Sequence, residues 1–105
     1  MTDTAQRGLS IIDTDDGAIS QLYRTRIAEF RRSKGWIWLN CGDFHTQSTV
    51  KALQTFLDYI QVPGRAYRVH GLIHVDVPEH LPRQVLNPSA EFKLSGRFLS
   101  EVING

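Results

Sequence analysis

Cysteine, net charge and long hydrophobic runs are all scarce in this sequence. Cys41 is the only cysteine, so no internal disulfide can form, and a lone thiol is typical of a reducing compartment. There is no run of about 18 apolar residues that could cross a membrane. Residues 1–7 have neither the basic start nor the apolar stretch of a secretory signal. We therefore expect a soluble cytoplasmic protein with no membrane partner.

The formal net charge is +1, which by itself indicates neither a nucleic-acid nor a membrane partner. The charge is unevenly distributed, however. Acidic residues dominate up to Ser20, and basic residues dominate from there to Gly35. Acidic residues at the start of a helix and basic ones at its end are both favoured by the helix dipole, so a helix explains part of this asymmetry without any partner.

The length and composition predict one small globular domain. A chain of 105 residues has room for a single core, and 41% hydrophobic with 22% charged residues is close to the globular average. The polar, aperiodic start predicts a flexible tail over residues 1–8. The single domain is then expected over residues 9–105.

A brief strand over residues 9–12, two helices and a buried strand are predicted in the first 64 residues. Ile19, Leu22, Tyr23, Ile27 and Phe30 recur at helical spacing, with Thr14, Asp15 or Asp16 as the N-cap and Gly35 at the C-terminal end. The run over residues 36–39 is short, apolar and rich in strand-favouring residues, so it predicts a strand buried on both faces. Helical spacing returns over residues 50–60, with Thr46 or Ser48 as the N-cap.

The second half of the chain alternates between apolar and polar residues. Residues 65–77 predict a long half-buried strand, in which Gly71 marks a bulge or a break into a hairpin. Asn87 before Pro88 resembles the start of a helix, and residues 98–103 have helical spacing. Residues 91–95 instead alternate as a strand does, so a strand followed by a short helix is the alternative.

Alternating strands and helices predict an α/β fold, in which a mostly parallel sheet is covered by helices. The alternative is an α+β fold with an antiparallel hairpin around Gly71.

Cys41 is the residue most suggestive of catalysis. It follows the predicted buried strand and precedes a helix, where the dipole can lower the pKa of a thiol. His45 is placed to accept the thiol proton and Asp43 to orient His45, as in a nucleophile, base and orienter. Against this interpretation, catalytic partners usually come from distant segments, and a free cysteine is commonly a buried hydrophobe.

Metal and cofactor sites receive no support from the sequence. His70 and His74 lie about 13 Å apart on an extended strand, too far to share one zinc ion. Gly42 belongs to no phosphate-binding or dinucleotide motif. We therefore predict no metal and no cofactor.

The sequence favours a non-catalytic binding or regulatory module that contacts another macromolecule, with a protein partner or self-association preferred. The candidate binding residues come from the basic first helix and from the polar face of the later strand: Arg24, Arg31, Arg32, Arg68, His70, His74 and Asp76. One alternative is a thiol enzyme or redox protein that uses Cys41 and His45. Another is a nucleic-acid-binding module that uses the basic helix.

Overall fold

The computed structural model of the protein describes residues 6–77 and 80–94. These contain eight strands, one short 3-10 helix (η1) and one α-helix. The elements are β1 (Leu9–Thr14), β2 (Gly17–Leu22), β3 (Thr25–Arg31), η1 (Arg32–Lys34), β4 (Trp36–Asn40), α1 (Gln47–Tyr59), β5 (Arg65–Val69), β6 (Leu72–Val77), β7 (His80–Val85) and β8 (Ser89–Lys93).

The strands form two antiparallel sheets. A five-stranded sheet has the order β1-β2-β3-β4-β8, and a three-stranded sheet has the order β5-β6-β7. Every neighbouring pair is antiparallel. The predicted α/β fold with a mostly parallel sheet is therefore wrong, because α1 is the one α-helix of the described residues and it joins β4 to β5 rather than two parallel neighbours.

The predicted first helix is instead the β2–β3 hairpin. Its turn falls at Tyr23 and Arg24, between the paired residues Leu22 and Thr25. The apolar spacing that resembled a helix arises from two alternating strands with a register shift after Ser20. That shift helps to place both Ile27 and Ala28 in the core. Strand pairing has overridden a local pattern that fits a helix equally well.

The predictions for β4 and α1 are largely correct. β4 is a strand, although only one of its faces is fully buried: Ile37 and Leu39 are inside, while Trp36 and Trp38 are half-buried on the opposite face. α1 begins after Thr46, whose hydroxyl accepts a hydrogen bond from the Thr49 backbone N–H at 3.2 Å.

The strands after α1 agree with the alternative predictions, which were a hairpin at Gly71 and a strand near residues 91–95. The chain reverses at Gly71, so that β5 and β6 form an antiparallel hairpin. Ser89–Lys93 is a strand that pairs with β4, so the helix expected to start at Pro88 is wrong. The helix predicted over residues 98–103 and most of the N-terminal tail lie outside the described residues.

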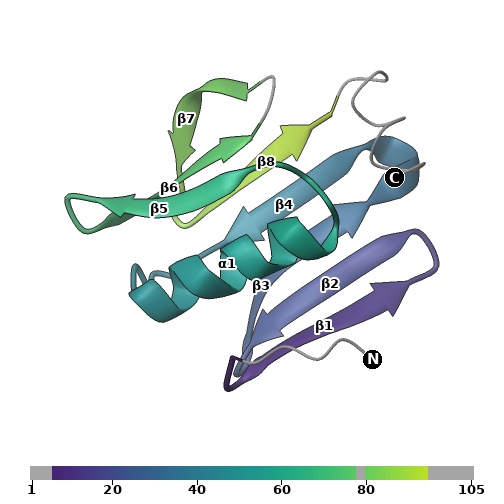
Figure 1. The fold of residues 1–105 in the computed structure, drawn as a ribbon, viewed down its shortest axis with the longest axis horizontal. Coiled ribbons are helices and arrows are strands. Elements are labelled where there is room, and N and C mark those ends of the chain that lie inside the picture. The colour runs from purple at the N-terminus through teal and green to yellow at the C-terminus, as the bar shows by residue number, and fades with distance from the viewer. Residues whose placement is uncertain (1–5, 78–79, 95–105) are drawn as a thin grey trace.

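The core lies between the large sheet and α1. Figure 1 shows α1 crossing one face of the large sheet, with β5, β6 and β7 beside it. The helix contributes Leu53, Phe56 and Leu57, all fully buried, and it packs against β2, β3 and β5. The molecule measures only 17 Å along its shortest axis, so the turns and loops at the edge of this layer provide the room for a site.

Candidate binding pocket

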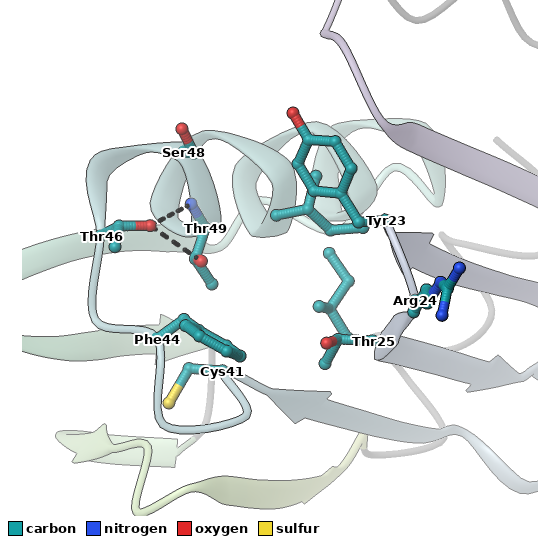
Figure 2. Close-up of a pocket in the computed structure, with 10 residues that line it drawn as sticks. Tyr23, Arg24, Thr25, Cys41, Phe44, Thr46, Ser48 and Thr49 are labelled. Atoms are coloured by element: carbon teal, nitrogen blue, oxygen red, sulfur yellow. Dashed lines mark hydrogen bonds between the residues drawn. The ribbon is translucent and has the colours of Figure 1, made fainter.

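An open pocket of about 430 Å³ lies where the β2–β3 turn meets the loop before α1. Figure 2 shows Tyr23 and Phe44 on opposite sides of this hollow, with Thr25 on one wall and the first turn of α1 on another. The pocket is lined by Leu22, Tyr23, Arg24, Thr25, Ile27, Cys41, Phe44, Thr46, Ser48 and Thr49. Half of these residues are polar, yet the surface that they expose to the pocket is mainly apolar, and Arg24 is the one charged residue among them.

Tyr23 is held in the β2–β3 turn in an unusual backbone conformation. Its φ is +53°, a left-handed value that is rare for a bulky residue. The Tyr23 backbone N–H donates a hydrogen bond to the Gly8 carbonyl at 2.7 Å. A Cβ at Gly8 would come within 2.5 Å of the Tyr23 ring, so this ring packs over the bare Gly8 backbone. The side chain nevertheless remains 64% exposed.

Phe44 is presented by a tight loop with two left-handed residues. Gly42 has a φ of +56° and Asp43 a φ of +67°. The Asn40 side-chain oxygen accepts the Gly42 N–H, and the Cys41 carbonyl accepts the Phe44 N–H at 2.8 Å. These bonds fix the loop, yet Phe44 is 59% exposed. Strained backbone that is held by its surroundings is typical of binding and catalytic sites.

Gly42 also sets the width of the pocket. A Cβ at this position would lie 2.9 Å from the Cγ2 methyl of Thr25, which belongs to the opposite wall. The absence of a side chain therefore allows the loop to approach β3 closely. The same loop is tied to β3 by the Asn40 side-chain amide, which donates to the Arg26 carbonyl at 2.9 Å.

Cys41 and His45, the predicted catalytic pair, are neighbours in the structure. The Cys41 Sγ lies 3.6 Å from Nε2 of His45. However, Nδ1 of His45 accepts the Ile73 backbone N–H at 2.9 Å. A neutral imidazole with Nδ1 as acceptor carries its proton on Nε2, so His45 donates to the sulfur and has no free lone pair for the thiol proton.

The environment of Cys41 also opposes thiolate formation. Its side chain is 1% exposed, and this burial raises the pKa of the Cys41 thiol above its usual value of 9.0. In Figure 2 the sulfur points away from the space between Tyr23 and Phe44. Asp43, the predicted orienting group, is exposed, while Ile73 bonds the His45 nitrogen that an orienting group would use.

The pocket hydroxyls are partly occupied by helix capping. Thr46 Oγ1 accepts the Thr49 N–H and lies 3.1 Å from Thr49 Oγ1. The Ser48 carbonyl accepts a hydrogen bond from the Gln6 side chain at 2.7 Å. The polar groups of this wall thus stabilise the start of α1, and the Ser48 hydroxyl lies at the exposed rim.

The predicted arginine surface is divided between the two ends of β3. Arg24 lies in the turn beside the pocket, whereas Arg31 ends β3 and Arg32 begins η1. Seven strand residues span about 23 Å, more than twice the length of seven helical residues. The Arg31 Nε bonds Glu29 at 2.8 Å and its guanidinium lies 5.4 Å from the centroid of Trp36. The Arg32 guanidinium lies 5.7 Å from the Phe30 ring centroid.

The predicted polar strand face is also dispersed. Arg68 lies opposite Ile73, and His70 occupies the β5–β6 turn with a φ of +52°. His74 is 8% exposed, and its ring stacks on Tyr67 with centroids 5.9 Å apart. The Tyr67 hydroxyl donates to Asp76 at 3.0 Å. His74 and Asp76 therefore serve the packing of the small sheet.

Tyr23 and Phe44 are the functional candidates that sequence reasoning missed. The helical spacing predicts Tyr23 on the apolar face of a helix, and so it does not predict an exposed side chain. The exposure of Phe44 could have been predicted from the sequence, because Phe44 follows Gly42 and Asp43, two residue types that tolerate left-handed turns. An aromatic residue directly after such a turn is a candidate for exposure.

Neither a metal cluster, nor a membrane-spanning helix, nor a similar known protein points to a function for the described residues. Among residues 6–77 and 80–94, no group of three or more His, Cys, Asp and Glu side chains is arranged to hold a metal ion. No helix in the described part of the chain is long and apolar enough to cross a membrane. Comparison with protein-family models, curated proteins and solved structures finds no match to this chain.

Proposed function

We propose that the protein is a non-catalytic binding module that takes an apolar side chain of a protein partner into the pocket between Tyr23 and Phe44. The observation that carries this proposal is the exposure of two aromatic side chains, 64% and 59%, on either side of one apolar hollow. Aromatic anchors that flank a pocket are typical of the residues that dominate binding energy at protein interfaces.

The size and chemistry of the pocket support a side chain as its occupant. Its volume of about 430 Å³ is near the lower end of the range for small-molecule sites, about 300–1,000 Å³. The pocket is open and lies at the edge of a thin molecule, as a partner surface requires. Arg24 at the rim favours a partner with an acidic residue beside its apolar anchor, because rim charges steer association.

The geometry supports a non-catalytic role. Cys41 is buried, its pKa is raised by desolvation, and His45 offers it a proton donor rather than a base. We also propose that the protein acts in the cytoplasm, because a lone unpaired cysteine is typical of proteins in a reducing compartment.

Selection from a random peptide library displayed on phage tests the proposal. We expect the folded protein to enrich peptides that share an apolar residue, and we expect Tyr23→Ala or Phe44→Ala to raise their dissociation constants about tenfold or more, about 1.4 kcal/mol. Both side chains are mostly exposed, so neither truncation should unfold the chain.

Val85→Ala is the matched control, because Val85 is a 40% exposed apolar residue on the other sheet. Its dissociation constants should equal those of the unmodified chain. A selection that yields no peptides, or peptides that bind the Tyr23 and Phe44 variants with unchanged affinity, would overturn the proposal.

A further inference from the structure

Among residues 6–77 and 80–94, the outer strand β1 has a strand on one side only. It is first in the strand order, and its one partner there is β2. Edge strands attract other strands, and proteins usually protect them with charged side chains, above all lysine, with proline or with a bulge. The six residues of β1, LSIIDT, contain neither lysine nor proline, and their pairing with β2 is regular. Their one charged residue, Asp13, accepts a hydrogen bond from the Tyr59 hydroxyl at 2.6 Å. Ile12 is 63% exposed on this strand.

The pairing with β2 determines which backbone groups face outward. The Tyr23 N–H donates to the Gly8 carbonyl, and Thr14 pairs with Gly17 across the two-residue turn. Hydrogen-bonded and non-bonded pairs alternate in an antiparallel ladder, so the even-numbered residues of β1 bond β2. The N–H and carbonyl groups of Ile11 and Asp13 consequently point away from the sheet. No backbone partner occurs for them within the described part of the chain.

We propose that a second copy of this chain pairs with β1 in antiparallel orientation, with Ile12 opposite Ile12. The two-fold axis of such a pair is perpendicular to the sheet and keeps each side chain on its own face. Residues opposite one another share a face. The axis therefore passes between two identical residues, and only a few registers are possible.

The register centred on Ile12 fits the open backbone groups. It places Ile11 of one copy opposite Asp13 of the second copy, so the two outward residues of each strand exchange N–H to carbonyl bonds. Ile12 then becomes a non-bonded pair, in which side chains approach most closely. Ile19, which lies opposite Ile12 in β2, continues the row. Four isoleucines from two copies thus meet on one face.

Charge and side-chain chemistry exclude the neighbouring registers. Pairing centred on Asp13 would set two carboxylates against each other, and pairing centred on Ile11 would leave Ile12 opposite Ser10. The Ile12 register instead sets Ile12 against Ile12 and Ser10 against Thr14, so no two like charges lie directly opposite each other. The paired strands are therefore compatible in charge as well as in apolar surface.

Sedimentation equilibrium of the full chain over a wide range of concentrations tests this proposal. We expect twice the mass of one chain, and we expect Ile12→Lys to give the mass of one chain because two ammonium groups would then face each other. Leu72→Lys is the matched control, since Leu72 is 45% exposed in β6, and it should remain dimeric. A monomeric unmodified chain, or a dimer that survives Ile12→Lys, overturns the proposal.

Cysteine cross-linking tests the register independently. We expect Ile12→Cys to form a disulfide-linked dimer on mild oxidation, because directly opposed non-bonded residues meet the distance requirement. Ser10→Cys is the control on the same face: it lies opposite Thr14 of the second copy and should stay unlinked. Native Cys41 is 1% exposed and does not compete. Equal cross-linking of both variants, or none of Ile12→Cys, contradicts this register.

Discussion

Single residues decide whether this site can perform chemistry, and Cys41 is the clearest example. Placement before a helix suggested an activated thiol, but the helix cap is Thr46. The backbone turn at Gly42 and Asp43 separates the sulfur from that cap, and Leu86 covers it from another segment, with its carbonyl 4.0 Å from Sγ. Burial raises the thiol pKa, and it outweighs the backbone hydrogen bonds from Asp43 and Phe44 that lower this pKa.

The Cys41 thiol should be unreactive in the folded protein. Its pKa is raised above 9.0, so iodoacetamide should label it only after denaturation at pH values below about 8. Because the Cys41 pKa is higher in the folded chain than in the unfolded chain, the protonated thiol stabilises the fold at pH values below its pKa in the unfolded chain. This contribution is lost as the pH rises through its pKa in the folded chain. Mass spectrometry after timed alkylation gives the rate. Rapid labelling of the folded chain would instead favour a thiol enzyme.

Gly42 should be the more sensitive of two glycines with left-handed backbone. Gly71→Ala is expected to cost about 1–2 kcal/mol from its φ of +78° alone, because nothing lies near its added methyl group. Gly42→Ala should cost more, since the methyl group would also meet Thr25 Cγ2 at 2.9 Å. Free energies of unfolding from urea titration measure both.

The matched rescue for Gly42→Ala is Thr25→Ser, which removes the Cγ2 methyl and keeps the hydroxyl. The double variant should recover the difference between the two glycine substitutions. Equal costs for Gly42→Ala and Gly71→Ala, or no recovery with Thr25→Ser, would show that Thr25 does not limit the approach of the loop.

At the scale of elements, the sequence predicted those structures whose signals are local. α1 has an unbroken helical period and a side-chain N-cap at Thr46, and both could be read from spacing alone. Gly71 marked a reversal, and the chain turns there. The β2–β3 turn at Tyr23 and Arg24 has no glycine, proline, asparagine or aspartate, so nothing local separated two strands from one helix.

The pocket depends on that unpredicted turn. Tyr23 comes from the β2–β3 hairpin and Phe44 from the loop before α1, and the two meet only because β3 pairs with β4. The sequence pointed to the second segment, because Cys41, Asp43 and His45 lie there as candidates for chemistry. The sequence did not point to the β2–β3 turn, because its spacing predicts Tyr23 on the apolar face of a helix, and such a residue is not expected to border a pocket.

At the scale of the whole molecule, the fold separates three surfaces. α1 crosses one face of the large sheet, with the small sheet beside it (Figure 1). β1 has no partner on its outer side among the described residues. The pocket lies at the end of the β2–β3 hairpin beside the start of α1. Tyr23 bonds Gly8, the residue just before β1. Antiparallel pairing of two β1 strands would therefore place the two pockets at opposite ends of the shared strands, suited to a bivalent partner.

The most direct test of the account is an NMR titration of the labelled protein with indole, which has the shape of a tryptophan side chain. We predict that the largest amide shift changes occur at Thr25, Phe44 and Ser48, around the pocket, and that Tyr23→Ala weakens them. Largest changes at Trp36 and Trp38, on the opposite face of the large sheet, or no changes at any indole concentration, would contradict a binding pocket between Tyr23 and Phe44.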